Sequence, residues 1–230
     1  DGMYEMADEL KQYIDSQQTF FQNASHELKT PLMTIQGYAE GIKDGIFTKE
    51  ETEKGLEVLV SEAKWLKSII NEMILLAKLE SRQSVYRPEK IEGENFLNQV
   101  VDRVIPFANE QGIVIEGQAD PNITFKADKE KMLQAVLNIV VNGIRHGRSQ
   151  VKISIMQKEK RPIIYIEDDG PGISKELQSN IFHRFVKGKD GETGLGLSIA
   201  RAIILQADGK LTADTSELGG ALFKIELPKR

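Results

Sequence analysis

A histidine with a carboxylate beside it and a hydroxyl one helical turn later is the most reactive combination in the sequence. His26 precedes Glu27, and Thr30 lies four residues after His26. Residues at i and i+4 share a helix face, so Thr30 is expected close to His26. His26 lies off the apolar stripe of its helix, and a solvent-facing, largely neutral imidazole can act as a nucleophile that a carboxylate orients. These residues predict a catalytic site, with an ordinary surface histidine as the alternative.

Two asparagines at helical spacing predict a site for a cation and its phosphates. Asn138 and Asn142 lie one turn apart in an apolar stretch, and Arg145 follows. Amide oxygens on one helix face can hold Mg²⁺, with Asn142 as its ligand and Asn138 bound to the cation or to a phosphate. The guanidinium of Arg145 can meet phosphate oxygens. A polar helix surface is the alternative interpretation.

A glycine-rich turn follows a strand-like run that ends at Asp168. The carboxylate of Asp168 can accept a hydrogen bond from an exocyclic amine such as that of adenine. Gly170 and Gly172 would let a ligand approach the backbone closely. The sequence predicts a nucleotide-binding turn here, although the same residues would serve in a simple strand-ending turn.

A further glycine-containing stretch opens a helix, and N–H groups at a helix N-terminus attract phosphate. The polar, glycine-rich residues 186–193 before it have the composition of a mobile lid over a nucleotide. Two phenylalanines that precede this lid could anchor its hinge or could be core aromatics. The predicted nucleotide contacts of this region are Phe182, Phe185, Lys187, Gly194, Leu195 and Gly196.

Composition and charge narrow the class of protein. A hydrophobic fraction of 40% with 28% charged residues is ordinary for a soluble globular protein. The net charge of −5 argues against a nucleic-acid partner. The absence of cysteine excludes disulfides and thiolate metal sites and fits a reducing cytosol. No apolar run approaches the roughly 18–20 residues needed to span a bilayer, and no signal peptide is visible.

Two long helices are predicted over residues 1–46 and 48–80. Gly45 ends the first as a left-handed cap, and Thr48 with Glu51 forms a capping box for the second. The apolar residues of the second helix recur at steps of three and four, at Leu56, Leu59, Ala63, Leu66, Ile70, Met73 and Ala77. A hairpin of two helices cannot bury both apolar stripes, so a homodimer that forms a four-helix bundle is expected.

A proline inside the first helix, Pro31, predicts a bend beside His26. Residues 81–88 break the helical periodicity and predict a linker. Beyond them, helices and strands do not alternate strictly, which favours a two-layer α/β sandwich. Helices are expected near 94–110, 128–145 and 194–207, and strands near 89–92, 113–117, 122–126, 151–155, 164–166, 210–214 and 221–227.

The chain resembles the cytoplasmic half of bacterial sensor histidine kinases over nearly its whole length. Five motifs occur in the order found in that family. Residues 24–31 resemble its H box, 138–142 its N box, 168–172 its first glycine box, 182–185 its F box and 194–196 its second glycine box. Glu192, Arg145 and Gly143 depart from the residues that are frequent at their positions in the family.

The resemblance implies a multidomain protein with an α part and an α+β part. Residues 1–15 would end a signalling helix, 16–80 would form the dimerisation and histidine-phosphotransfer hairpin, 81–88 a linker and 89–230 a Bergerat-type catalytic ATP-binding domain. It also implies that His26 is autophosphorylated from Mg²⁺-ATP and passes the phosphoryl group to an aspartate of a response regulator. The position of Thr30 is associated with phosphatase activity in the family.

The implied partners are a second copy of the chain and the receiver domain of a response regulator, without a nucleic acid. The chain would be the cytoplasmic portion of a receptor that reaches the membrane through a missing N-terminal region. Two other functions compete with this one. ATPases of the gyrase or chaperone type, which share this fold, usually carry a glutamate as base at the position of Asn138, and an amide cannot accept a proton, so Asn138 disfavours efficient ATP hydrolysis. A coiled-coil scaffold with a degenerate nucleotide site is the third hypothesis, and intact His26, Asn142 and Asp168 argue against it.

Overall fold

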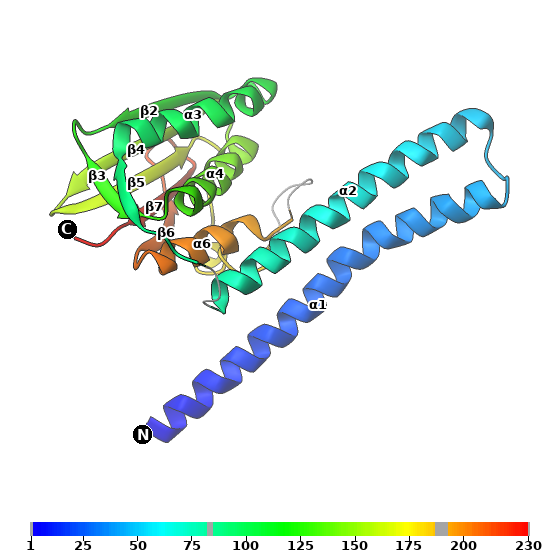
Figure 1. Ribbon diagram of the computed structural model, residues 1–230, viewed down its shortest axis with the longest axis horizontal. Helices are drawn as coiled ribbons and strands as arrows, with labels where there is room; N and C mark the ends of the chain where they lie inside the picture. Colours follow the sequence, from blue (N-terminus) through cyan, green and yellow to red (C-terminus); the bar gives the residue numbers. More distant parts are fainter. Residues whose placement is uncertain (1, 82–84, 187–192, 230) are drawn as a thin grey trace. The chain divides into compact units, whose positions relative to one another are not determined.

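The computed structural model describes residues 2–81, 85–186 and 193–229. The chain divides into two compact units, Asp1–Ile74 and Leu75–Arg230. The first holds most of a helical hairpin and the second holds a mixed sheet with its helices (Figure 1). The fold class expected from the sequence is confirmed. The described residues include no helix that is both long enough and apolar enough to cross a membrane.

The hairpin consists of α1 (Gly2–Lys43) and α2 (Lys49–Glu80). Gly45 has a φ of +67°, so it provides the predicted left-handed cap. The predicted capping box is also present: the backbone N–H of Thr48 donates to Glu51 Oε2 at 2.7 Å, and the N–H of Glu51 donates to Thr48 Oγ1 at 3.2 Å. These local contacts reverse the chain within a few residues.

Glycine and aromatic residues pack closely at the closed end of the hairpin. A Cβ on Gly41 would lie 2.6 Å from Phe47 Cζ, and one on Gly55 would lie 3.0 Å from Tyr38 Cδ1. The rings of Tyr38 and Phe47 are 6.0 Å apart. The absence of side chains at the two glycines therefore lets the ends of the helices approach each other.

The apolar stripe predicted along α2 is partly buried and partly exposed to solvent. Leu59, Leu66 and Met73 are half-buried, whereas Leu56 and Ile70 remain 50% and 45% exposed. On α1, Met3, Met6, Leu10, Tyr13, Phe21 and Leu32 are likewise exposed. A single hairpin thus leaves a long apolar surface open to solvent.

The second unit contains a five-stranded sheet in the order β2-β4-β5-β7-β6 and a two-stranded sheet of β1 and β3. Among the described strands of the large sheet, β2 and β4 pair in parallel and the other neighbours pair antiparallel. The strands are β1 (Glu89–Glu92), β2 (Val114–Ala119), β3 (Thr124–Ala127), β4 (Gln150–Lys158), β5 (Arg161–Asp168), β6 (Lys210–Thr215) and β7 (Ala221–Glu226). The helices are α3 (Gly93–Glu110), α4 (Lys129–His146), α5 (Lys175–Gln178) and α6 (Gly196–Gln206).

One face of the large sheet is apolar and covered by helices α3, α4 and α6 (Figure 1). In β4, Val151, Ile153 and Ile155 are buried against this layer, while Lys152 on the other face is only half-buried. The burial pattern of β7 alternates in the same way. The predicted two-layer sandwich is therefore present, and its core lies between the sheet and the helices.

Two features of this unit were not predicted. The four-residue helix α5 was not expected, and the end of α2, residues 75–80, belongs to this unit, whereas the predicted hairpin extends to residue 80. Leu76 and Leu79 of this segment are buried. Glu80 Oε1 and Oε2 each accept a hydrogen bond from Arg184 Nη2 at 2.9 Å.

Candidate functional site

The predicted nucleophile lies in the middle of α1. His26 is exposed and Glu27 is half-buried. The hydroxyl of Thr30, also exposed, donates to the backbone carbonyl of His26 at 3.3 Å. This bond is the one expected if Thr30 serves only the helix, although an O–H that donates keeps lone pairs that accept. Helix α1 continues through Pro31, which cannot donate the backbone hydrogen bond of its turn.

Helix α4 carries the two predicted asparagines. The helix begins after Asp128, whose side chain accepts a hydrogen bond from the N–H of Lys131. The side-chain amide of Asn138 donates to the carbonyl of Gly196 at 3.1 Å, so Oδ1 of Asn138 keeps its lone pairs for a cation. Asn142 follows one turn later and is half-buried. The bond from Asn138 fixes α4 against the start of α6.

Arg145 lies in the last turn of α4. Its guanidinium carbon is 5.8 Å from the centre of the Phe107 ring in α3, which is within range of a cation–π interaction. The side chain is therefore held at the helix layer in this structure. Its predicted contact with phosphate stays a prediction.

The carboxylate of Asp168, at the end of β5, is buried and 2% exposed. Its Oδ1 accepts hydrogen bonds from the N–H groups of Gly170 at 2.9 Å and Ala221 at 3.3 Å. Burial raises the pKa of the Asp168 carboxyl, and the two N–H donors act in the opposite direction. Within the described residues, Oδ2 accepts no hydrogen bond. One oxygen is thus fixed by the protein and the other can accept from a ligand.

Glycines without room for a side chain surround Asp168. A Cβ on Gly220 would collide with Oδ1 and the backbone oxygen of Asp168, and a Cβ on Gly170 would collide with the carbonyl of His146. Gly172 has a φ of +77°. Gly220, in the β6–β7 turn, was not among the predicted site residues. Its place in a Gly-Gly pair was the signal that could have identified it.

Asp169 has a structural role that the sequence reasoning missed. Its carboxylate accepts hydrogen bonds from the backbone N–H groups of Arg148, Ser149 and Gln150 and from the hydroxyl of Ser149. Partial desolvation raises the pKa of Asp169, but these four donors together lower it well below its usual value. Asp169 therefore ties the turn after α4 to the end of β5, next to Asp168.

The two ends of the predicted lid are joined at their base. The N–H of Phe185 donates to the carbonyl of Gly194 at 2.7 Å, and both residues have positive φ, +62° and +76°. The hydroxyl of Ser198 donates to the carbonyl of Phe182 at 2.9 Å. We call these two hydrogen bonds the lid base. Lys187, like the rest of residues 187–192, lies outside the described residues.

Helix α6 begins at Gly196 with Leu195 as its N-cap. The leucine side chain carries no hydrogen-bond acceptor, and no side-chain cap is present at this end of the described helix. Its first N–H groups are therefore available to an anion such as a phosphate. The described residues contain no group of three or more His, Asp or Glu residues that could hold a metal, so an ion here would depend on amide oxygens and on a ligand's own phosphates.

Two family models match the chain. Residues 16–82 match the "His Kinase A (phospho-acceptor) domain", and residues 127–230 match the "Histidine kinase-, DNA gyrase B-, and HSP90-like ATPase". His26 lies in the first of these ranges and the predicted nucleotide contacts lie in the second. The predicted bounds of the helical part, residues 16–80, and of the ATP-binding part, residues 89–230, stay predictions.

Similar proteins that cover more of the chain extend the comparison. Sensor histidine kinase CssS of Bacillus subtilis (strain 168) is 33% identical over 230 residues, which cover 98% of this chain and 49% of CssS. Full-length ShkA in complex with AMPPNP is 27% identical over 91% of this chain and 46% of its own, with a TM-score of 0.68. Histidine kinase ThkA in complex with response regulator protein TrrA matches 99% of this chain and 66% of its own at 22% identity and a TM-score of 0.77, a likeness of fold. The chain spans about half the length of CssS.

Proposed function

We propose that this chain, which belongs to the sensor histidine kinase family, transfers the γ-phosphoryl group of ATP to a ring nitrogen of His26. The observation that carries the proposal is the carboxylate of Asp168, which is buried among glycines with one oxygen bound to backbone N–H groups and the other open to a ligand. This arrangement suits the exocyclic amine of adenine. The exposed imidazole of His26 supplies the acceptor.

The nucleotide would be held by groups of different chemistry. Asp168 would bind adenine, the N–H groups at the start of α6 would bind phosphate, and Arg145 would neutralise phosphate charge. Asn142 would bind Mg²⁺, and Asn138 would bind Mg²⁺ or a phosphate through Oδ1. The bound ion would supply charge neutralisation for phosphoryl transfer.

The neutral imidazole of His26 would attack phosphorus in line with the leaving oxygen. The N–P bond forms as the bond to the bridging oxygen breaks, and ADP leaves. Glu27 would accept a hydrogen bond from the other ring nitrogen, which fixes the tautomer and stabilises the cation that forms. The phosphoryl group would then pass to an aspartate of a response regulator. The phospho-acceptor domain match and the sensor kinase relatives support this partner.

An amide at position 138 favours the kinase over the competing ATPase. A hydrolytic enzyme needs a base that takes a proton from water, and neither atom of the Asn138 amide can do so. The nitrogen of this amide is moreover engaged with Gly196. We therefore expect slow hydrolysis of ATP by the chain in the absence of His26.

Autophosphorylation tests the proposal directly. The purified chain with Mg²⁺ and γ-labelled ATP should acquire a phosphoramidate that is lost in acid and survives in base, and mass spectrometry should locate it on His26. His26→Ala should abolish labelling while ATP affinity, measured by calorimetry, stays within about twofold, because the histidine is not needed to bind nucleotide. Full labelling of this variant would contradict the assignment.

A phosphatase activity toward the regulator is the second proposed activity, and the hydroxyl of Thr30 next to His26 favours it. Thr34 provides a matched control, because its hydroxyl donates to the carbonyl of Thr30 at 3.2 Å in the same way, one turn further. Thr30→Ala should slow dephosphorylation of the regulator and leave autophosphorylation within a few-fold, whereas Thr34→Ala should change neither. Equal effects of the two substitutions would assign Thr30 to the helix alone.

We also propose a homodimer in which two hairpins bury the exposed apolar surface as a four-helix bundle. Light scattering should give about twice the chain mass of 25.8 kDa. Ile70→Glu should dissociate the dimer, and Ser68→Glu, at a nearby exposed position, should not. A monomer that labels His26 at micromolar concentration would refute this assembly. We further infer that the chain works in the cytoplasm, where ATP is available, as part of a longer membrane-anchored receptor.

A further inference from the structure

A cavity of about 480 Å³ lies away from the predicted nucleotide contacts on α4 and at the end of β5. Its walls come from α5, the F-box segment, α6 and the edge strand β6. A volume of this size is in the range of small-molecule sites. Of the predicted nucleotide residues that the structure describes, only Phe182 contributes to its lining.

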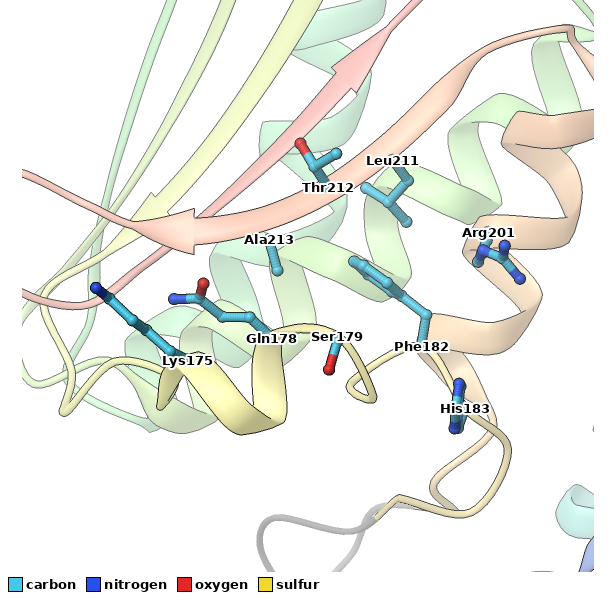
Figure 2. A pocket seen from close by; sticks show the side chains of 9 residues that line it. All are labelled: Lys175, Gln178, Ser179, Phe182, His183, Arg201, Leu211, Thr212 and Ala213. Carbon is cyan, nitrogen blue, oxygen red and sulfur yellow. The ribbon is translucent and has the colours of Figure 1, made fainter.

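Among the described residues, the lining of the cavity carries positive charge. Lys175 and Arg201 are at opposite ends of it, and His183 lies toward the Arg201 end (Figure 2). Across the described ranges, the side chains of Lys175, His183 and Arg201 make neither a hydrogen bond nor an ion pair. The part of the lining that the structure describes holds no aspartate or glutamate, although the chain as a whole has a net charge of −5. The described lining is thus opposite in sign to the net charge of the molecule.

Apolar side chains form the middle of the cavity. Leu211 and Ala213 point from β6 toward the ring of Phe182 (Figure 2). The Phe182 ring is held from behind by Phe223 of β7, at a centroid distance of 6.1 Å and an angle of 70°. This surface is therefore flat, apolar and fixed, which suits the face of a planar ligand.

We propose that this cavity binds a small organic anion with a flat apolar body, such as an aromatic carboxylate or sulfonate. The acidic group binds Arg201, with His183 as a second donor, and the ring lies on Phe182 between Leu211 and Ala213. A guanidinium forms two parallel hydrogen bonds to a carboxylate or sulfonate, which fixes the orientation of the ligand. This inference does not depend on the proposed kinase activity.

The probe is 2-naphthalenesulfonate, titrated by calorimetry into the full chain saturated with Mg²⁺-AMPPNP so that the nucleotide site is occupied. Saturable binding of one probe per chain is expected. Because a charge-assisted hydrogen bond is lost, Arg201→Gln should weaken binding by about tenfold or more. Arg103→Gln removes another exposed arginine, from α3, and should leave the affinity within about twofold. The uncharged 2-naphthalenemethanol should bind about tenfold more weakly than the sulfonate and should not respond to Arg201→Gln.

A second substitution tests the apolar part. Ala213→Leu fills the space over Phe182 and should abolish binding of both probes, with urea unfolding used to verify the fold. Absence of saturable binding to the wild-type chain would overturn the inference. Equal affinities of Arg201→Gln and Arg103→Gln for the sulfonate would overturn it too, because the probe would then be bound to another apolar surface such as the exposed stripe of the hairpin.

Discussion

Gly194→Ala tests whether nucleotide binding requires the closed lid base. Gly194 has a φ of +76°, and an added Cβ would lie 2.7 Å from Phe185 Cα and 2.9 Å from Phe185 C. Backbone atoms cannot move aside as the end of a flexible side chain can. Phe185 is also constrained, because it is only 9% exposed and has a positive φ itself.

The expected loss of nucleotide affinity in Gly194→Ala is the sum of two free-energy costs. An alanine in the left-handed region costs about 1–2 kcal/mol. Separation of the two residues loses the hydrogen bond of 2.7 Å between Phe185 N–H and the Gly194 carbonyl, a further ~0.5–1.5 kcal/mol. If the nucleotide binds only when the lid base is closed, the sum of about 1.5–3.5 kcal/mol appears as a roughly 10- to 300-fold loss of Mg²⁺-AMPPNP affinity.

Gly112→Ala is the matched control. Gly112 has a similar φ of +68°, but a Cβ there would meet nothing within 4 Å. This variant should lose about 1–2 kcal/mol of unfolding free energy in urea and keep its nucleotide affinity. Calorimetric titration with Mg²⁺-AMPPNP and urea unfolding of both variants provide the comparison. Wild-type affinity of Gly194→Ala would refute the reasoning, because the lid base could then open without consequence for the ligand.

Three further predictions concern single residues. The pKa of Asp169 is lowered by folding, so its contribution to stability is present above its unfolded pKa near ~4 and is lost as the pH falls. Asp169→Asn should therefore reduce the free energy of unfolding, measured in urea at pH 7, by about 1–3 kcal/mol. A difference between variant and wild type that is unchanged near pH 3 would contradict this role of Asp169. The pKa of Asp168 is raised by folding, so its stabilising contribution is present at low pH and is lost as the pH rises through the pKa of the folded state. Asp168→Asn should therefore be at least as stable as the wild type at pH 7, while its nucleotide affinity, measured by calorimetry, should be lower by about tenfold or more. A normal nucleotide affinity would show that adenine binds elsewhere. Thr48→Ala should destabilise the hairpin by about 1 kcal/mol in thermal unfolding because the N–H of Glu51 loses its acceptor, and an unchanged midpoint would show that the box adds nothing.

Most helices and strands could be predicted from the sequence because caps and apolar periodicity, which define them, involve residues that are close together in the chain. The prediction of helix 128–145 agrees closely with α4 (Lys129–His146), since Asp128 caps its start and its apolar residues repeat with helical period. Helix α5 has only four residues, too few for a period to emerge. The order of the strands depends on pairings between distant segments, such as β5 with β7, which no local pattern contains.

In the candidate site, too, contacts between neighbours in the sequence could be predicted and contacts between distant residues could not. Asp168 and Gly170 are two residues apart, so the hydrogen bond between them could be anticipated from a strand that ends in a glycine-rich turn. Gly220 comes close to Asp168 from a position about fifty residues later in the chain. The bond from Ser198 to Phe182 joins two motifs that look independent in the sequence. Such partners could not be predicted because they are brought together only by the completed fold.

If a second copy covers the exposed half of the α2 stripe, protein concentration becomes part of the folding equilibrium. If two chains bury this surface together, each tenfold rise in concentration adds about 1.4 kcal/mol to the free energy of unfolding per dimer. Leu56 and Ile70 would then be protected from solvent only to the extent that a second copy is present. The midpoint of thermal unfolding of the hairpin would rise with the amount of chain in solution, and two differently labelled preparations would exchange subunits at the rate at which the bundle opens.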